Sequence, residues 1–253
     1  MRTVVVGASS GLGRCIGVGL AQRGHDVALL ARRKERLDSA VVEAGETAVA
    51  IACDVTDVGS VESAIEEAAR HLGGIDAVIY TPGIGPLSRI EDTDAETWRS
   101  VFDTNVTGAS VVTSVALPHL RSAGGRAIFL SSVSGSLTPP WPGLGAYNVS
   151  KAALERLVHV WRNEHPDVGF TCIVVGDCAG GEGDAMTGFA DGWDPELAVE
   201  FGTAWFERKL LSGSLFDVEE LVGAVEGLLH NGPTVAIPTL VITPRAPAPD
   251  QPS

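Results

Sequence analysis

The stretch TVVVGASSGLG, residues 3–13, joins a short run of β-branched residues to a loop with three glycines. The run Thr3–Val6 is apolar throughout its centre, as expected of a strand that is covered on both faces. Gly7, Gly11 and Gly13 then allow the positive φ angles and close approaches that a tight strand-to-helix turn needs. Because amides at the start of such a helix point at the edge of the sheet, the stretch predicts a pyrophosphate site.

A glycine-rich loop alone is a weak signal, because a flexible turn has the same composition. Its position after the first strand and before a helix, in a chain where such segments alternate, favours a dinucleotide-binding turn. We therefore expect the cofactor to contact this loop through Gly7, Ser9, Ser10, Gly11, Leu12 and Gly13.

Beyond this loop, short apolar runs alternate with segments of helical periodicity. Apolar residues recur at helical spacing in 58–71, with acidic residues opposite, and again in 217–230. This alternation predicts a parallel sheet wound by right-handed crossovers. The expected strands are Thr3–Val6, Val27–Ala31, Ala48–Cys53, Ala77–Tyr80, Ala127–Ser131, Phe170–Val175 and Val235–Ile242.

Size and composition describe a globular protein with one domain, residues 1–245. The segment at about 176–215 breaks the alternation, because it is first Gly-rich and acidic and then aromatic. Long excursions in compact domains are usually lids or binding loops, so we interpret it as a substrate-loop insertion. The Pro-rich tail at 246–253 is expected to be disordered.

The charge balance is strongly acidic, with 18 Lys and Arg residues against 32 Asp and Glu residues. A formal net charge of −14 disfavours nucleic acid and anionic membranes as partners. No apolar run approaches the ~18 residues of a membrane span, and the N-terminus has no cleavage site for a secretory signal. The four cysteines lack a C-x-x-C spacing, so we expect small buried thiols and a cytoplasmic protein.

The end of the second strand predicts which dinucleotide is bound. Folds that select NAD usually carry an acid there for the ribose 2′-hydroxyl, whereas this chain reads ARRK at 31–34, with no acid until Glu35. Guanidinium groups bind phosphate with paired hydrogen bonds, so Arg32 and Arg33 favour NADP (NADPH) over NAD. The alternative is that these charges are solvated at a helix start. Asp54, after the third strand, is expected either to accept from the adenine amino group or to cap the next helix.

The stretch SSVSGSLTPPWPGLGAYNVSK, residues 131–151, places Tyr147 and Lys151 one helical turn apart, beyond a loop too rich in Pro and Gly to be helical. A free phenol has a pKa near ~10, and an ammonium on the same helical face favours the phenolate. The pair could therefore be a proton donor and its activator. The alternative is a packed tyrosine and a solvated lysine.

Five motifs in chain order resemble the short-chain dehydrogenase/reductase family: GASSGLG at 7–13, CDV at 53–55, NVTG at 105–108, SSVSG at 131–135 and YNVSK at 147–151. The resemblance extends from Gly7 to about Ile242. It implies an α/β, Rossmann-like, doubly wound, open and mostly parallel sheet of about seven strands in three α/β/α layers. It also implies a nicotinamide cofactor.

The resemblance further implies a Ser-Tyr-Lys-Asn active site. Tyr147 would be the acid/base, Lys151 its partner, and Asn105 would hold a water in a proton relay. The local motif selects Ser132 as the serine, whereas counting thirteen residues back from the tyrosine selects Ser134. The remaining expected cofactor contacts are Asp54, Val55, Gly83, Tyr147, Lys151 and Gly176.

Two departures from the family pattern concern the loops after the fourth and sixth strands. TPG at 81–83 stands where the family has Asn-Ala-Gly, and no threonine follows Gly176 until Thr187. The closing glycines usual near the seventh strand are also missing. The carboxylates at 177, 182 and 184 are expected to be solvated, and no metal site is predicted.

We thus expect an NADP-dependent oxidoreductase that transfers a hydride between nicotinamide and a carbonyl or secondary alcohol. Trp141, Trp193, Trp205 and Phe206 suggest a small apolar or aromatic substrate, although core packing explains them equally well. The alternative is a non-catalytic dinucleotide sensor of the same fold. A homo-oligomer, a dimer or a tetramer, is expected.

Overall fold

The computed structural model describes residues 1–181, 183–232 and 234–245. It contains a sheet of seven parallel strands in the order β3-β2-β1-β4-β5-β6-β7. The predicted fold class is therefore confirmed. The strands are β1 (Arg2–Val6), β2 (Asp26–Ala31), β3 (Ala48–Ala52), β4 (Ala77–Tyr80), β5 (Arg126–Ser132), β6 (Gly169–Val175) and β7 (Thr239–Ile242). The predicted tail at 246–253 lies outside the described residues.

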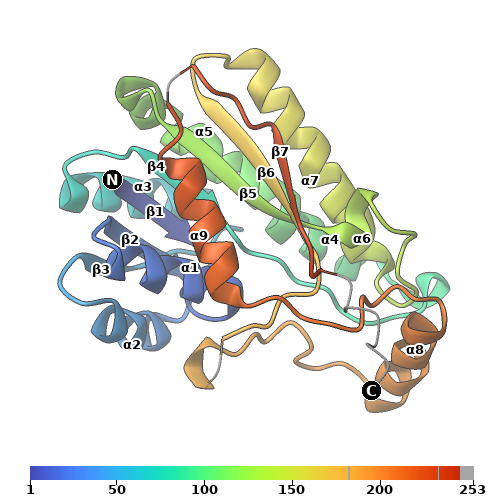
Figure 1. Cartoon of the computed structure of the whole chain (residues 1–253). Helices are drawn as coiled ribbons and strands as arrows, with labels where there is room; N and C mark the ends of the chain where they lie inside the picture. Colours follow the sequence, from blue (N-terminus) through green and yellow to red (C-terminus); the bar gives the residue numbers. More distant parts are fainter. Residues whose placement is uncertain (182, 233, 246–253) are drawn as a thin grey trace, which may run out of the picture.

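Helices cover both faces of this sheet (Figure 1). One face packs against α1 (Gly11–Gln22), α2 (Lys34–Ala44) and α9 (Val218–Leu229), and the other against α3 (Val58–Leu72), α5 (Gly108–Ala123) and α7 (Gly145–Glu164). Successive strand residues point to opposite faces of the sheet: Val5 packs on the side of α1, α2 and α9, and Val4 on the side of α3, α5 and α7. Because both faces are buried, the strands are apolar along nearly their whole length.

The last strand is shorter than predicted. It begins at Thr239, whereas the apolar pattern suggested Val235. The preceding segment still follows β6, since the carbonyls of Ile237 and Pro238 accept hydrogen bonds from Thr171 and Cys172. Pro238 itself has no amide proton to add to the ladder, which delays the regular strand.

The expected non-helical loop after β5 contains one helical turn, α6 (Val133–Ser136). Between β4 and α5 lie a 3₁₀ turn (Ile90–Asp92), α4 (Ala95–Phe102) and a π-helical turn (Asp103–Thr107). The insertion after β6 carries a 3₁₀ turn (Gly183–Ala185) and α8 (Pro195–Glu207).

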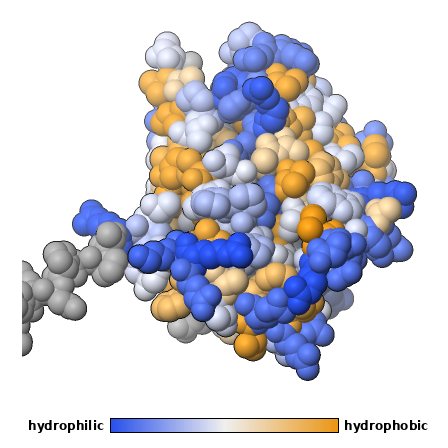
Figure 2. Space-filling model, turned by 90° about the vertical axis from the view of Figure 1, so that its right-hand side faces the viewer, coloured by the Kyte–Doolittle hydropathy of each residue, from blue (hydrophilic) through white to orange (hydrophobic). Residues whose placement is uncertain are grey.

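The inner face of α8 builds a third apolar cluster against the loops below it. Phe201 and Trp205 pack there with Leu87, Leu144 and Leu210. The side of the molecule that carries α6, α7 and α8 shows apolar residues in separate groups among hydrophilic ones (Figure 2). No helix in the described residues is both long enough and apolar enough to span a bilayer.

Sheet topology also fixes where a ligand would bind. The strand order reverses between β1 and β4, which start crossovers toward opposite edges of the sheet. In open α/β sheets a crevice forms at this switch point, beyond the carboxyl ends of the strands. The loops after β1, β4, β5 and β6 all lead into it.

Candidate active site

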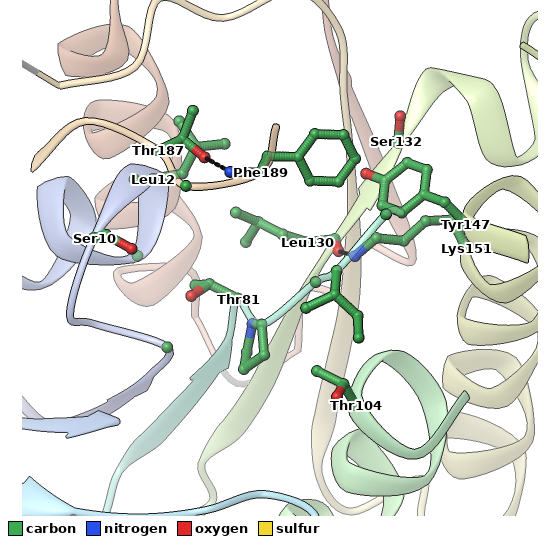
Figure 3. A pocket seen from close by; sticks show the side chains of 18 of the residues that line it. Ser10, Leu12, Thr81, Thr104, Leu130, Ser132, Tyr147, Lys151, Thr187 and Phe189 are labelled. Atoms are coloured by element: carbon green, nitrogen blue, oxygen red, sulfur yellow. Dashed lines mark hydrogen bonds between the residues drawn. The ribbon is translucent and has the colours of Figure 1, made fainter. Parts of the chain in front are cut away.

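A cleft of about 1190 Å³ opens at the carboxyl ends of the central strands. Ser10 and Leu12 of the glycine loop lie on one side of it, and Tyr147 and Lys151 lie on the other (Figure 3). The cleft is bordered by every residue predicted for the site except Asn105. The structure thus brings together segments that are separated by up to 169 positions in the sequence, from Gly7 to Gly176.

The glycines of the first loop are required by its geometry. Gly7 and Gly11 have φ angles of +86° and +57°, a region that residues with a side chain rarely adopt. A Cβ on Gly13 would lie 2.2 Å from Thr81 Oγ1 and 2.5 Å from the carbonyl oxygen of Gly7. The tight strand-to-helix turn therefore depends on glycine at all three positions.

The start of α1 is open toward the cleft. The first amides of a helix have no intrahelical acceptor, and they give this end a partial positive charge. Ser10 is the N-cap, but within the described residues its side chain makes no capping hydrogen bond. Instead, Arg33 donates to the hydroxyls of Ser9 at 2.9 Å and Ser10 at 2.8 Å. These unused amides and nearby donors fit the pyrophosphate of a dinucleotide.

Three arginines lie near one another beyond β2: Arg32 and Arg33 directly after the strand, and Arg36 in the first turn of α2. Partial burial of Arg33, together with the positive charges of Arg36 and Arg32, lowers the pKa of its guanidinium. Arg32 and Arg33 both border the cleft. Mutual repulsion among these cations would be relieved by an anion placed between them.

Asp54 borders the same cleft as Arg32 and Arg33. Its Oδ1 accepts from the amide of Thr56 at 3.0 Å and from the Thr56 hydroxyl at 2.8 Å. These hydrogen bonds hold the pKa of the carboxyl below its ordinary value, and the charge of Arg32 adds to the effect. Because Asp57 caps α3, the helix-capping alternative for Asp54 is wrong. Val55 follows on the cleft wall.

Tyr147 and Lys151 face the cleft from adjacent turns of α7. Lys151 is 3% exposed. Its ammonium lies 5.6 Å from the centre of the Tyr147 ring and donates to the carbonyl of Leu130 in β5 at 2.8 Å. The alternative of a solvated lysine is therefore wrong. The Tyr147 ring is half-buried.

Burial dominates the proton affinities of this pair. Desolvation raises the pKa of Tyr147 to about 12, although the nearby Ser132 side chain opposes the shift. Desolvation also lowers the pKa of Lys151 to about 8, against the opposing charge of Glu155. The expected lowering of the phenol pKa is therefore wrong for this structure, because removal from water outweighs any attraction by the ammonium.

The two candidate serines occupy different environments. Ser134 is 3% exposed, whereas Ser132 lies half-buried at the end of β5, on the cleft wall, and its side chain acts to lower the pKa of the phenol. Their hydroxyls are 3.0 Å apart, so Ser134 supports Ser132 from behind. This arrangement favours Ser132 as the hydroxyl nearer the reacting groups.

Asn105 lies behind the cleft wall in the π-helical turn, fully buried. Its amide nitrogen donates to the carbonyl of Ile84 at 3.0 Å and to Ser150 Oγ at 2.9 Å, while its oxygen accepts from the Ile84 amide at 2.9 Å. Asn105 therefore ties the loop after β4 to α7. The water that it is expected to hold stays a prediction.

The loop after β4, with the sequence TPG at 81–83, is held by contacts of its own residues. Thr81 Oγ1 donates to the carbonyl of Val6 at 2.7 Å and so joins the ends of β1 and β4. A Cβ on Gly83 would lie 3.2 Å from Lys151 Nζ, so this glycine gives the ammonium its space. Gly176 is confined in a similar way, because an added Cβ would lie 3.0 Å from the Thr243 side chain.

The insertion returns to the cleft. Thr187 lies directly above Gly11, and the Phe189 ring packs edge-on against the Tyr147 ring at 4.9 Å between centres. Figure 3 shows Thr187 beside Leu12, with the Phe189 ring between it and Tyr147. Trp193 donates to the carbonyl of Gly85 at 2.9 Å and packs against Phe189. This segment therefore covers the part of the cleft beside Tyr147.

Other predicted features fall outside the reacting part of the cleft. Asp177 accepts from the amide and hydroxyl of Ser212, both at 2.6 Å, rather than standing free in solvent. Phe206 is 74% exposed on α8 and does not face the substrate region. Of the four free cysteines, Cys15 and Cys178 are only half-buried, contrary to expectation.

Three features were not found from the sequence: the strand-joining hydroxyl of Thr81, the Leu130 carbonyl under Lys151, and the return of Phe189 to Tyr147. Position at a strand end was the available signal for the first. The other two depend on tertiary contacts, which sequence spacing does not encode.

Comparison with known proteins gives a consistent picture. A family model described as short chain dehydrogenase matches residues 2–184. The Arabidopsis thaliana protein called 11-beta-hydroxysteroid dehydrogenase-like 2 is 32% identical over 180 residues, 68% of this chain and 58% of that protein. The hydroxynaphthalene reductase of Aspergillus fumigatus is 36% identical over 156 residues, 60% of this chain and 56% of that protein. The matches therefore span less than two thirds of these relatives.

Among solved structures, the alcohol dehydrogenase of the archaeon Thermococcus sibiricus, complexed with 5-hydroxy-NADP, has a TM-score of 0.79. It shares 25% sequence identity, and the match covers 98% of both chains. A short-chain dehydrogenase of Streptomyces avermitilis has a TM-score of 0.78 at 27% identity, covering 95% of this chain and 88% of the other.

Proposed function

Because this chain belongs to the short-chain dehydrogenase family, we propose that it is an NADP-dependent oxidoreductase that reduces a carbonyl to a secondary alcohol, or catalyses the reverse reaction. The observation that carries the proposal is that Tyr147 and Lys151 border the same cleft as the glycine loop.

The arginines beside the glycine loop support NADP as the cofactor. The open amides of α1 and the hydroxyls of Ser9 and Ser10 would hold the pyrophosphate, and Arg32 and Arg33 would hold the 2′-phosphate. Asp54 and Val55 would border the adenine. Gly83 and Gly176 would leave room for the nicotinamide half.

The bound nicotinamide would supply the hydride, with its two electrons, to the carbonyl carbon. Tyr147 would give its phenolic proton to the carbonyl oxygen, so that the products are an alcohol and the oxidised cofactor. Its raised pKa, about 12, means that the phenol carries this proton throughout the neutral range. Ser132 would donate a hydrogen bond to the oxygen as negative charge develops there.

Lys151 and Asn105 would act around this step. Below its pKa of about 8, Lys151 is an ammonium beside the tyrosine ring, so it would stabilise the phenolate left after proton transfer. Asn105 would keep the loop after β4 in register with α7, and a water held near it would return the proton.

The walls of the cleft support a small apolar or aromatic substrate. Trp141, Phe189 and Trp193 line the cavity near Tyr147, and Trp205 packs behind Trp141. Two relatives are named for a steroid and a naphthalene, both apolar ring systems. Apolar walls bind such rings by removing them from water.

A screen of NADPH oxidation tests this function. Wild-type protein is incubated with NADPH and a panel of aldehydes, ketones and quinones, and absorbance at the reduced-nicotinamide band is followed. We expect turnover of at least one apolar aromatic carbonyl. Tyr147→Phe should lower kcat by about 10²-fold or more, because it removes the proton donor, while the Kd for NADPH changes less than about twofold.

Two results would count against the proposal. Turnover that survives in Tyr147→Phe would exclude the tyrosine as the proton donor. NADPH binding without oxidation across the panel, in wild-type protein, would favour the non-catalytic sensor.

A further inference from the structure

Glu155 lies one turn beyond Lys151 on α7 and contacts the serine-bearing end of β5. Ser131 Oγ donates to Glu155 Oε1 at 2.7 Å, and Ser136 Oγ donates to Glu155 Oε2 at 2.5 Å. One carboxylate therefore joins residues on both sides of Ser132. Charge-assisted hydrogen bonds of this kind are stronger than neutral ones and fix geometry.

The turn held in this way packs tightly on the helix. A Cβ on Gly135 would lie 2.9 Å from Glu155 Oε1 and 3.1 Å from Lys151 Cβ, so only glycine lets α6 approach α7 so closely. Ser131 Oγ also lies 3.4 Å from the carbonyl oxygen of Lys151. Through these contacts, Glu155 links the turn that carries Ser132 to the helix that carries the tyrosine and the lysine.

The carboxylate also bears on the ammonium of Lys151. The groups around Lys151 are Tyr147 and Glu155 on α7, Cys172 on β6, and the carbonyl of Leu130 on β5. Burial raises the pKa of Cys172 to about 12 and that of Tyr147 to about 12, so both are uncharged near neutral pH. Glu155 is then the anion among them.

We propose that Glu155 is a positioning residue that holds the Ser132 turn and the Lys151 ammonium in register on α7. This inference rests on the proposed function, since it assigns Glu155 a part in placing the groups that act there. It makes two separable predictions, because the Glu155 side chain carries a negative charge near Lys151 and is long enough to reach both Ser131 and Ser136.

The effect of the Glu155 charge on the pKa of Lys151 is tested by titrating the lysine, without measuring turnover. The chain has three lysines, Lys34, Lys151 and Lys209, so ¹³Cε-labelled lysine gives a simple NMR spectrum. The signal that is missing from the spectrum of Lys151→Met is that of Lys151. In Glu155→Gln the pKa of Lys151 should fall by about 0.5–1 unit, because an opposite charge is removed. Glu164→Gln, an exposed acid on the same helix, should leave it unchanged.

The length is tested by Glu155→Asp, which keeps the charge but is too short to reach both serines. We expect the Lys151 titration to stay near the wild-type value while kcat falls about tenfold, with the Kd for NADPH changed less than about twofold. Glu155→Gln should lower kcat and also move the pH profile toward lower pH. Glu164→Gln should match the wild type in each measurement.

The outcomes separate this inference from the proposed function. A wild-type Lys151 titration in Glu155→Gln, or a wild-type kcat in Glu155→Asp, would overturn the role of Glu155 while leaving the oxidoreductase intact. If no carbonyl is reduced by the wild type, the proposed function fails, and the NMR titration alone decides whether Glu155 sets the proton affinity of Lys151. Should Glu155→Gln not fold, Glu155→Asp decides by its kcat.

Discussion

Tyr147 and Lys151 share one face of α7, yet the structure gives them proton affinities that their spacing does not predict. The four-residue separation correctly indicates that both face one cavity, because spacing along a helix is a local property. The pKa directions depend on how much water the surrounding loops exclude, which is a tertiary property. At this scale the sequence therefore predicts which residues meet but not their proton affinities.

Burial of the Lys151 ammonium carries a cost in stability that depends on pH. Its pKa is 10.5 in the unfolded chain and about 8 in the fold. Below pH 8 both states hold the proton and the cost is complete. Between pH 8 and 10.5 the unfolded chain holds more protons, so the free energy of unfolding rises with pH and the cost disappears.

Lys151→Met should therefore raise the free energy of unfolding at pH 7 by up to about 3 kcal/mol, and this gain should shrink as the pH approaches 10. Urea denaturation at pH 7 and pH 9.5 measures it. Lys34→Met, at an exposed site on α2, serves as the control with little change at either pH. If Lys151→Met has a lower free energy of unfolding than the wild type at pH 7, burial of the Lys151 ammonium does not destabilise the fold as predicted.

The loop between β1 and α1 is the element whose local sequence predicted most. Three glycines after a buried strand require a turn, and the structure places each where a side chain would collide or a positive φ is needed. Elements with less local information were predicted less well. The helical turn α6 forms within a Pro- and Gly-rich stretch because Glu155 and α7 hold it in place. The return of the insertion to Tyr147 rests on aromatic packing far from it in sequence.

Gly13→Ala tests the turn at the scale of this element. The added methyl group would meet Thr81 Oγ1 and the Gly7 carbonyl, so we expect a loss of about 1–3 kcal/mol in the free energy of unfolding and loss of NADPH binding. Gly227→Ala, in α9, where an added Cβ meets nothing within 4 Å, should not destabilise. Chemical denaturation and calorimetry read out both variants. Wild-type stability and NADPH affinity in Gly13→Ala would contradict this role of the loop.

For the molecule as a whole, sheet order and charge together locate the site. Alternating strands and helices predict a doubly wound parallel sheet, which has a switch point. In the structure the switch point lies between β1 and β4, and the cleft opens there. The net charge of −14 would repel an anionic cofactor, so binding depends on the local cations beside the glycine loop. The homo-oligomer and the cytoplasmic location stay predictions, and Val149 and Val160, exposed on α7, are apolar positions available to a second copy.

The most direct test of the account is a calorimetric titration of the wild-type chain with NADPH and with NADH. We predict that NADPH binds at least about tenfold more tightly, because the 2′-phosphate adds charge-assisted hydrogen bonds. Arg33→Ala should abolish this preference, whereas Arg70→Ala, which removes the same charge from the exposed side of α3, should retain it. NADH binding as tight as that of NADPH, or no binding of either, would contradict the account.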